Sequence, residues 1–322
     1  MVQDFIAAID IGGTKIAVAI GTESGEIVAR RAIKTDAAIP PEAVVSELLE
    51  TLETLAAQHD GRLVSVGIGA PGPLDLERGR VLAPPNMPDS WQDFALRSFV
   101  KRQTGLPVAV DNDANAAAVG EHFYGAGRGY NDLVYLTIST GIGGGIIADD
   151  NLVHRVGEAG HVIVRPDGAL CGCGAHGCLE AECSGTAIAR RAQEYLRLGK
   201  ESKLLDLASD IEHVTAKTVT DAVSEGDELA CTVWRETIQL MAVGIGSIIA
   251  LLAPQAVILG GGVAAGAGEL LLQPLRDELK KRVRIVTMRS VDILQAGLGV
   301  DSGLYGALAL GARALRTLGT IT

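Results

Sequence analysis

FIAAIDIGGTKIAVAIG, residues 5–21, carries the clearest fold signal in the chain. Two apolar runs, each the length of a strand, flank the turn IGGTK, and a third run, IVARRAI, follows the turn TESGE. Short apolar runs bounded by glycine and polar turn residues are typical of β-strands. The sequence therefore predicts three antiparallel strands with a glycine loop at the first turn.

The same order of elements recurs in the middle of the chain. Leu133–Ile138 is a second apolar run, STGIGGG at 139–145 is a second glycine loop, and IIADDNLV is a further strand and turn. Repetition at this level indicates two similar α/β halves. We expect a smaller N-terminal domain at 1–115, to which a last helix at about 302–322 crosses back. A larger domain at 116–301 would carry the cysteine-rich stretch described below.

Helical spacing of apolar residues predicts the segments that connect the strands. A proline near the start supports a helix at 41–59, and Gly105 is a suitable stop for a helix at 89–104. Buried strands are expected at LVSVGIGAPGPL, PVAVDND and AVILGGGV. Further helices are expected at 185–198, 226–253 and 268–282.

Composition and charge narrow the class of protein. The 322 residues are 48% hydrophobic and 21% charged, with 3% aromatic residues, so the core must be built from Ala, Val, Ile and Leu. Such a core suits parallel strands covered by helices. The net charge of −11 argues against a partner such as nucleic acid, which normally meets a basic surface. It does not exclude small anionic substrates, because backbone amides and a metal can hold phosphate in an acidic protein.

The sequence also bears on location. The N-terminus MVQDFIAAID carries an acid and lacks the pattern of a signal peptide. The longest apolar run, Met241–Ala253, has about thirteen residues and predicts a buried helix rather than a membrane span. Clustered cysteines without a secretory signal favour metal binding over disulfides. We expect a cytoplasmic protein without a membrane partner.

The stretch Gly157–Glu180, GEAGHVIVRPDGALCGCGAHGCLE, predicts a zinc site. Its candidate ligands are His161, Cys171, Cys173 and Cys178, because thiolate and imidazole groups at this spacing suit tetrahedral zinc. His176 and Cys183 are rivals for the fourth position. Four protein ligands would leave no open position on the metal, so the zinc would be structural. A folded loop would also draw Glu158 and Glu180 together.

The hexapeptide DIGGTK, Asp10–Lys15, combines a carboxylate, two glycines, a hydroxyl and a cation at one turn. Exposed amides of such a turn can hold phosphate, and a nearby acid can hold Mg²⁺ through water. A plain glycine hairpin with a surface lysine is the alternative.

The P-loop spacing is absent. GIGAPG at 67–72 matches the dinucleotide spacing, but Pro71 and Pro73 would disrupt the helix that receives the pyrophosphate.

DNDAN, Asp111–Asn115, lies where a strand ends and a helix begins. Ligands collect at strand ends in open α/β sheets. Asp113 is placed to accept the proton of a substrate hydroxyl, the base that phosphoryl transfer requires. Helix capping by Asn112 or Asp113 is the alternative, although capping explains one polar residue and not four.

Taken together, these residues resemble the ROK family of sugar kinases along nearly the whole chain. The matching segments occur in the family's order: DIGGTK at 10–15, DNDANAAA at 111–118, STGIGGG at 139–145, GEAGH at 157–161, CGCGAHGCLE at 171–180 and ILGGGV at 258–263. The cysteine block with GEAGH is highly specific, whereas the glycine loops alone are not.

The resemblance implies an actin/hexokinase-like fold, two ribonuclease H-like domains with a cleft between them. It also implies Mg²⁺-ATP as phosphoryl donor and a hexose hydroxyl as acceptor. At the matching positions Asp113 would be the general base, and His161 would turn one ring nitrogen to zinc and the other to the sugar. The implied sugar-binding residues are Asn86, Asn112, Asp113, Glu158, His161 and Glu180. The implied residues at magnesium, phosphates and nucleotide are Asp10, Gly12, Gly13, Thr14, Lys15, Thr140, Gly141, Gly261 and Gly262.

Several alternatives remain open within this resemblance. Glucose is favoured, but N-acetylmannosamine, N-acetylglucosamine, fructose, mannose or allose would fit the same motifs. A sugar-responsive repressor is disfavoured, because the first strand begins by Phe5 and leaves no room for a DNA-binding domain. Polyphosphate or ADP could replace ATP as donor. The resemblance suggests a homodimer or homotetramer.

Overall fold

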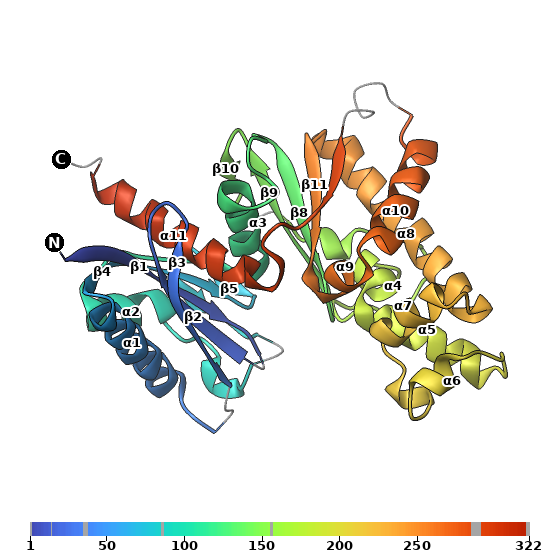
Figure 1. The fold of residues 1–322 in the computed structure, drawn as a ribbon, viewed down its shortest axis with the longest axis horizontal. Coiled ribbons are helices and arrows are strands. Elements are labelled where there is room, and N and C mark those ends of the chain that lie inside the picture. Colours follow the sequence, from blue (N-terminus) through green and yellow to red (C-terminus); the bar gives the residue numbers. More distant parts are fainter. Residues whose placement is uncertain are drawn as a thin grey trace. The chain divides into compact units, whose positions relative to one another are not determined.

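The chain divides into two compact units. The computed structural model describes residues 2–13, 15–34, 38–84, 87–154, 157–284 and 291–319 (Figure 1). Unit 1 comprises Met1–Arg128 and Val300–Thr322, and unit 2 comprises Gly129–Gly299. The last helix, α11 (Ser302–Gly319), returns to the N-terminal unit as expected. The boundary lies later than the predicted position after residue 115, because α3 (Asp113–Tyr124) packs on α11 within unit 1.

Unit 1 is built on a five-stranded sheet of order β3-β2-β1-β4-β7. The predicted antiparallel trio is confirmed, whereas β1, β4 and β7 run parallel. A separate pair of short strands, β5 (Leu74–Asp75) and β6 (Arg80–Val81), follows β4. The strands of the main sheet are β1 (Gln3–Ile11), β2 (Lys15–Gly21), β3 (Ile27–Lys34), β4 (Gly61–Ala70) and β7 (Val108–Asn112).

Strand β1 is buried on both faces, which explains its continuous apolar run. Phe5, Ala7 and Ile9 belong to the core that includes α1 (Pro41–Gln58) and α2 (Leu96–Thr104). The alternate residues Ile6 and Ala8 pack with α11. Successive side chains of a strand point to opposite faces, so helices on both sides require apolar residues at every position.

The helix predicted at 89–104 begins later than expected. Only a 3₁₀ turn forms at Asp89–Trp91, and α2 starts at Leu96. Between them Asp93 adopts a left-handed conformation with φ of 57°, and Phe94 bridges to Val81. This tertiary contact overrides the helical spacing. The predicted stop is confirmed, because Gly105 has φ of 69° and its N–H donates to the Lys101 carbonyl at 2.9 Å.

Unit 2 repeats the sheet of unit 1 with order β10-β9-β8-β11-β12. Again the first three strands in sequence are antiparallel and the last two join the sheet in parallel, which confirms the predicted duplication. Glycines 143–145 lie inside β9, so the second glycine loop is only Ser139–Gly141. The strands are β8 (Leu133–Ile138), β9 (Ile142–Ala148), β10 (Asn151–Leu152), β11 (Ala256–Gly260) and β12 (Asp292–Gln295).

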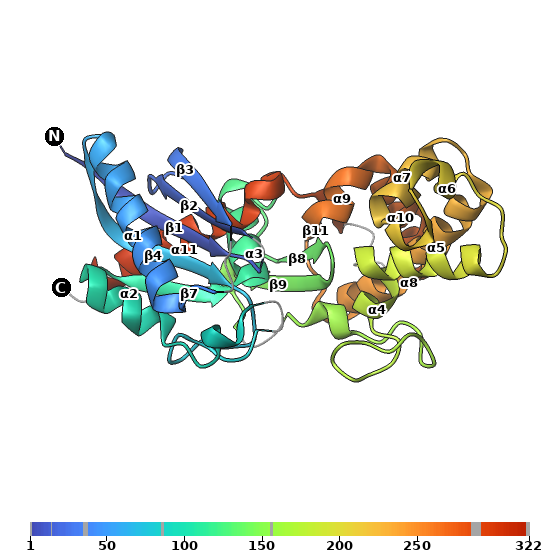
Figure 2. The same cartoon turned by 90° about the horizontal axis from the view of Figure 1, so that it is seen from below.

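Helices of unit 2 pack around α8 (Glu228–Leu252), which contacts α4, α5, α7 and α10 (Figure 2). Among the described residues, α8 is the one helix long and apolar enough to span a membrane by length and composition. Its Val233 and Trp234 lie in the core, and the Trp234 indole donates to the Leu270 carbonyl at 2.9 Å, as in a core helix. The other helices are α4 (Leu179–Cys183), α5 (Gly185–Arg197), α6 (Leu204–Leu207), α7 (Ala216–Ser224), α9 (Gly261–Ala267) and α10 (Glu269–Arg282).

Candidate functional site

The parallel strands of unit 1 bring two acids to one edge of the sheet. Their register places Asp10 of β1 beside Gly69 of β4, and Gly69 beside Asp111 of β7. Gly69 separates Asp10 from Asp113: a Cβ at Gly69 would stand 3.7 Å from Asp10 Oδ1 and 3.8 Å from the Asp113 Cα atom. Asp10 and Asp113 therefore lie close together at this edge of the sheet.

Asp10 is a half-buried carboxyl whose charged form is disfavoured. Burial and the neighbouring charge of Asp113 raise the pKa of Asp10 to about 6, against an opposing effect of Lys15. Gly303 of α11 packs directly on this group, since a Cβ there would lie 2.4 Å from Asp10 Oδ2. A divalent cation would offset the repulsion between the two carboxylates. The donor set therefore fits Mg²⁺ held by oxygen ligands.

The turn that follows Asp10 is a tight hairpin, as predicted. The Gly12 N–H donates to the Lys15 carbonyl at 3.0 Å, and a Cβ at Gly12 would lie 2.7 Å from that oxygen, so the turn requires glycine. Gly13 is half-buried and the Lys15 side chain is exposed at the start of β2. Thr14 lies outside the described residues. Phosphate binding by this turn stays a prediction.

The structure separates the roles within DNDAN. Asp111 is 2% exposed, and its Oδ1 accepts from the Asn112 N–H and from Asn115 Nδ2, both at 2.8 Å. Asn112 caps α3, accepting from the Ala114 N–H at 3.0 Å. These three residues hold the strand-to-helix junction. Asp113 is the exposed acid of the motif, with Oδ1 also 2.8 Å from the Ala114 N–H.

The predicted zinc ligands come together in unit 2. One ligand atom from each of His161, Cys171, Cys173 and Cys178 lies within 4.8 Å of every other. Cys171 Sγ is 3.6 Å from His161 Nδ1, and Cys173 Sγ is 3.7 Å from Cys178 Sγ. Sulfur ligands of tetrahedral zinc, each about 2.3 Å from the metal, are roughly 3.8 Å apart. The cluster therefore fits a closed zinc site.

The two rival ligands have other roles. His176 turns Nδ1 to the Gly168 carbonyl at 3.0 Å, and Cys183 is buried with Sγ 3.6 Å from the Thr237 carbonyl. Neither belongs to the cluster. Within it, burial raises the pKa of Cys178 to about 12, so ionising this thiol is unfavourable unless a cation is bound. This is the charge that zinc supplies, because a coordinating thiol is deprotonated by the metal.

Acidic groups surround the imidazole at this cluster. While His161 Nδ1 faces Cys171, its Nε2 lies 3.8 Å from Glu158 Oε2. Glu180, on α4, places Oε1 3.8 Å from Cys171 Sγ and accepts from the Ile142 N–H through Oε2 at 2.9 Å. Glu158 and Glu180 thus both lie at the cluster, the first beside His161 and the second beside Cys171. Glu158 is 90% exposed and available to a ligand.

Asn86, the remaining residue expected at the sugar, lies outside the described residues, so its position stays a prediction.

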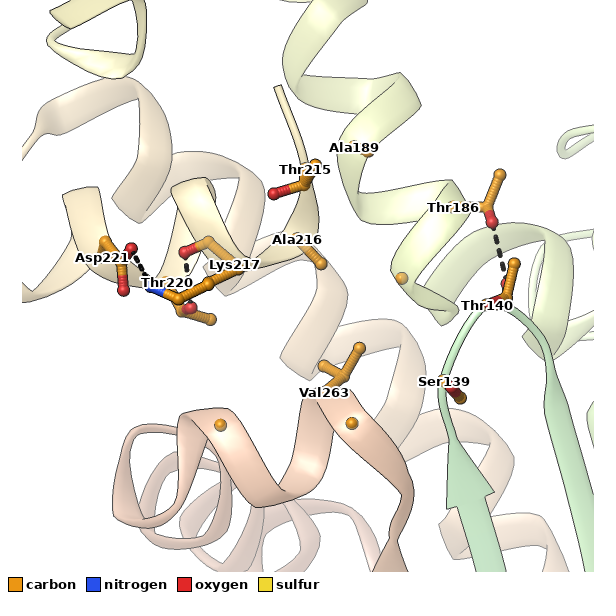
Figure 3. A pocket seen from close by; sticks show the side chains of 13 residues that line it. Ser139, Thr140, Thr186, Ala189, Thr215, Ala216, Lys217, Thr220, Asp221 and Val263 are labelled. Carbon is orange, nitrogen blue, oxygen red and sulfur yellow. Dashed lines mark hydrogen bonds and ion pairs between the residues drawn. The ribbon is translucent and has the colours of Figure 1, made fainter. Parts of the chain in front are cut away.

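A second region of unit 2 is a cavity of about 610 Å³ (Figure 3). It brings together Thr140 from the β8–β9 turn and Gly262 from α9, both predicted at the nucleotide. Gly141 and Gly261 do not line it. The full lining is Ser139, Thr140, Gly185, Thr186, Ala189, Thr215, Ala216, Lys217, Thr220, Asp221, Gly262, Val263 and Gly266.

The two predicted glycines outside this lining serve packing. A Cβ at Gly141 would stand 2.4 Å from Glu180 Oε2. Gly261 has φ of +83°, and its Cβ would lie 2.4 Å from the Ile138 carbonyl oxygen. Only glycine permits this combination of a left-handed backbone and a close approach to β8.

The residues of α5 and α7 that line the cavity were not predicted from the sequence. Thr186 of α5 donates its hydroxyl to the Thr140 carbonyl at 2.9 Å, and Lys217 pairs with Asp221 at 2.6 Å on α7. Gly157–Glu180, which contains the predicted zinc ligands, is called the zinc loop below. The segment SGT that follows it could have predicted the start of α5, because Ser184 caps this helix by accepting from the Ala187 N–H. Nothing in the sequence of α7 pointed to the cavity.

Known proteins share this architecture. The sequence model of the ROK family matches residues 6–314. The glucokinase of Thermotoga maritima is 35% identical over 95% of this chain and 96% of its own. The N-acetylmannosamine kinase of Yersinia pestis is 33% identical over 95% of this chain and 97% of its own.

A solved structure extends the comparison to the fold. The ROK family glucokinase from Streptomyces griseus, in complex with glucose and AMPPNP, has a TM-score of 0.79 at 36% identity, covering 96% of this chain and 99% of that one. The two duplicated units are thus those of an actin-like ATPase fold, as the sequence predicted.

Proposed function

The chain belongs to the ROK family, and we propose that it is a glucokinase, which transfers the γ-phosphoryl group of ATP to the 6-hydroxyl of glucose. Such a protein is an ATP-dependent hexokinase-type phosphotransferase. The observation that carries the proposal is the pairing of an exposed acid, Asp113 at the start of α3, with a half-buried acid, Asp10 near the end of β1. Phosphoryl transfer uses this combination of a base and a metal-neutralised charge.

Asp113 is the base in this proposal. It is exposed, and the other polar residues of its motif are engaged in capping and in a buried pair. Its carboxylate would accept the proton of the sugar 6-hydroxyl as the phosphoryl group moves across. A carboxylate can do this late in a loose transition state, when the hydroxyl proton has become acidic.

The sugar is proposed to meet Glu158, His161 and Glu180, with Asn112 and Asn86 completing the set. Carboxylates are strong acceptors for hydroxyl donors. With Nδ1 on zinc, the neutral imidazole carries its proton on Nε2, which would donate to a sugar oxygen. Zinc itself would be structural, since four protein ligands close its coordination.

The nucleotide is proposed to occupy the 610 Å³ cavity of unit 2. Ala189, Ala216 and Val263 give it an apolar wall suited to a base, and hydroxyls of Thr140 and Thr186 lie at its edge. Asp10 and the hairpin Gly12–Lys15 would hold the Mg²⁺ and the phosphates. An apolar cavity of this kind favours a nucleotide over polyphosphate as donor.

Another hexose is the second candidate substrate, favoured by the similarity to N-acetylmannosamine kinase. A panel of hexoses and donors, assayed for phosphorylated product, tests both. We expect the highest kcat/KM with glucose and Mg²⁺-ATP. A higher value with N-acetylmannosamine would replace glucose, and no phosphorylation of any hexose would overturn the proposed function.

We further propose a cytoplasmic homodimer or homotetramer without nucleic-acid partners, in line with the net charge of −11. Sedimentation velocity of the purified chain tests the assembly. A monomer at working concentrations would contradict it.

A further inference from the structure

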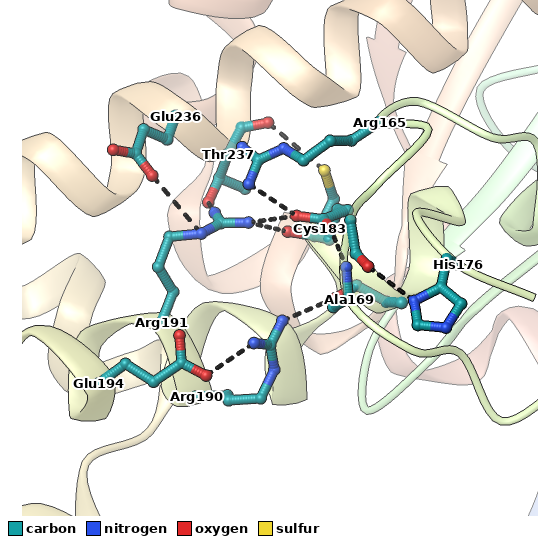
Figure 4. A network of polar contacts seen from close by, with 12 residues as sticks. Arg165, Ala169, His176, Cys183, Arg190, Arg191, Glu194, Glu236 and Thr237 are labelled. Atoms are coloured by element: carbon teal, nitrogen blue, oxygen red, sulfur yellow. Dashed lines mark hydrogen bonds and ion pairs between the residues drawn. The ribbon is translucent and has the colours of Figure 1, made fainter.

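Helices α4 and α5 carry a buried ion pair that none of the roles above uses, and Figure 4 shows the polar contacts around its Arg191. Arg191 of α5 and Glu182 of α4 are 6% and 2% exposed, with Nη2 and Oε2 3.0 Å apart. The same guanidinium donates to the Glu182 carbonyl at 2.8 Å and to Thr237 Oγ1 at 3.0 Å, and it lies 3.6 Å from Glu236 Oε2. The arginine therefore joins α4, α5 and α8.

The second oxygen of Glu182 holds the zinc loop. Oε1 accepts from the Ala169 N–H at 2.7 Å, and the Ala169 carbonyl accepts from the Gly177 N–H at 2.8 Å. Gly177 directly precedes the zinc ligand Cys178. A continuous chain of hydrogen bonds thus runs from Arg191 to the backbone N–H that precedes Cys178.

The loop has little room to shift at these contacts. A Cβ at Gly168 would lie 2.2 Å from Glu182 Oε1, and one at Gly177 would lie 1.5 Å from the Arg165 carbonyl oxygen. Arg165 also approaches the carboxylate, with Nη1 3.7 Å from Glu182 Oε2. Loss of the carboxylate would release the base of the loop rather than a single side chain.

The pair also lies close in sequence to residues of both candidate binding regions of unit 2. Glu180, proposed at the sugar, lies one residue before Ala181 and two before Glu182 on the short helix α4. Gly185, Thr186 and Ala189, at the start of α5, line the 610 Å³ cavity. Arg191 follows on the same helix.

Stability alone is a weak reason for such a pair. Desolvation of two buried charges roughly cancels their attraction, so apolar residues of similar size are often as stable. Geometry is the better reason, because a carboxylate with two fixed oxygens can bind the loop and the arginine at once.

We propose that Glu182 and Arg191 are positioning residues, which hold the zinc loop and Glu180 in the arrangement that binds the sugar. The proposal rests on the proposed function for its sugar readout, but not for its zinc readout.

The test compares Glu182→Gln with the wild type. Glutamine keeps the shape and one acceptor oxygen but removes the charge that pairs with Arg191. We expect zinc transfer to a chromogenic chelator to accelerate by about tenfold or more, in the range found for groups that orient metal ligands. We expect the KM for glucose to rise by about tenfold and the KM for ATP to change less than about twofold.

The matched control is Arg197→Gln. Arg197 is the last residue of α5 and makes an exposed pair with Glu212 at 3.2 Å. Exposed pairs contribute little, so zinc release and both KM values should match the wild type. Arg191→Lys supplies a second variant if Glu182→Gln does not fold, since lysine keeps the charge but loses the fork that reaches two helices.

The double variant Glu182→Leu with Arg191→Leu separates positioning from stability. It removes both buried charges, so its thermal midpoint should recover toward the wild type, while zinc release stays fast and the KM for glucose stays high. If the thermal midpoint, the rate of zinc release and the KM for glucose all returned to wild-type values, the proposal would be overturned. So would a Glu182→Gln or Arg191→Lys protein that releases zinc no faster than Arg197→Gln.

Failure of the proposed function would look different. A wild type that phosphorylates no hexose refutes the glucokinase proposal, while the zinc-release comparison still decides the role of the pair.

Discussion

The hairpins β1–β2 and β8–β9 occupy the same place in their sheets but differ in chemistry. In unit 1 the last paired residues are Ile11 and Ile16, and in unit 2 they are Ile138 and Ile142. Asp10 precedes the first pair and Thr137 precedes the second. Each faces a glycine in the next parallel strand, Gly69 in one unit and Gly260 in the other.

The duplicated scaffold therefore sets the positions of these residues, whereas the identity of each residue sets its chemistry. The acid at Asp10 has a raised pKa and a second acid nearby, which suits a metal and phosphates. The hydroxyl at Thr137 has no such partner on its neighbouring strands, because β9 and β11 consist of apolar residues and glycine. The β8–β9 turn instead borders the apolar cavity proposed for the nucleotide.

The largest effect is expected from Asp113→Asn, which removes the proposed base. We expect kcat with glucose to fall by roughly 100- to 10,000-fold, the range for a lost general base, while the KM for glucose changes little. Steady-state kinetics and isothermal titration with glucose measure the two quantities. Turnover close to that of the wild type would refute the role of Asp113.

Asp10→Asn should lower kcat by about 100-fold, because a carboxylate ligand of the magnesium is lost. Thr137→Val, the matched change in unit 2, should leave kcat within about twofold. The assay is turnover at saturating glucose and Mg²⁺-ATP. An equal decrease of kcat in the two variants would contradict the proposed chemical difference between the two hairpins.

The same Asp10→Asn variant should be more stable than the wild type at neutral pH without magnesium. The pKa of Asp10 is raised from 3.8 to about 6 in the folded protein, so folding is opposed once this group ionises. The folded state binds more protons between these values, and wild-type stability therefore falls as the pH rises from about 4 to about 6. Asparagine does not ionise, so the variant avoids this decrease in the free energy of unfolding, which amounts to up to about 3 kcal/mol above pH 6.

Urea unfolding of both proteins at pH 4 and pH 7.5 measures this difference. The gain should be present at pH 7.5 and largely absent at pH 4. A gain of equal size at both values would show that the titration of Asp10 is not its source.

Zinc removal should act on the sugar side of unit 2 and leave the nucleotide side unchanged. After dialysis against a chelator, we expect the KM for glucose to rise about tenfold and the thermal midpoint to fall, because metal binding stabilises the loop. The KM for ATP should stay within about twofold. Unchanged glucose KM and stability would contradict the role given to the loop.

The smallest effect is expected from Thr186→Ala. This change removes the hydroxyl that donates to the Thr140 carbonyl and holds the β8–β9 turn at the cavity. Such a hydrogen bond contributes about 1 kcal/mol, so the KM for ATP should rise by at most about fivefold. Thr232→Ala is the control, since that exposed hydroxyl bonds only to its own helix at Glu228 in the contacts described. A rise in glucose KM instead of ATP KM would move the nucleotide elsewhere.

Local pattern made much of the site predictable. The strand–turn–strand repeat, the zinc ligands and the cap at Asn112 each depend on residues close in sequence, and all three are present as expected. The α7 side of the cavity was not predictable, because Lys217 and Asp221 read as an ordinary exposed pair on a helix surface. Only the packing of α7 beside α5 and α9 makes them line a cavity.

The duplicated α/β plan, and the side chains that could hold a metal or accept a proton, followed from the amino-acid sequence. They did so because apolar periodicity, turn glycines and ligand spacing act over short distances along the chain. The burial of Asp111, the exposure of Asp113 and the contact of Glu182 with Arg191 required the folded structure. The burial of a side chain and the groups that it contacts depend on which distant elements pack together, so neither can be read from residues that are close in sequence.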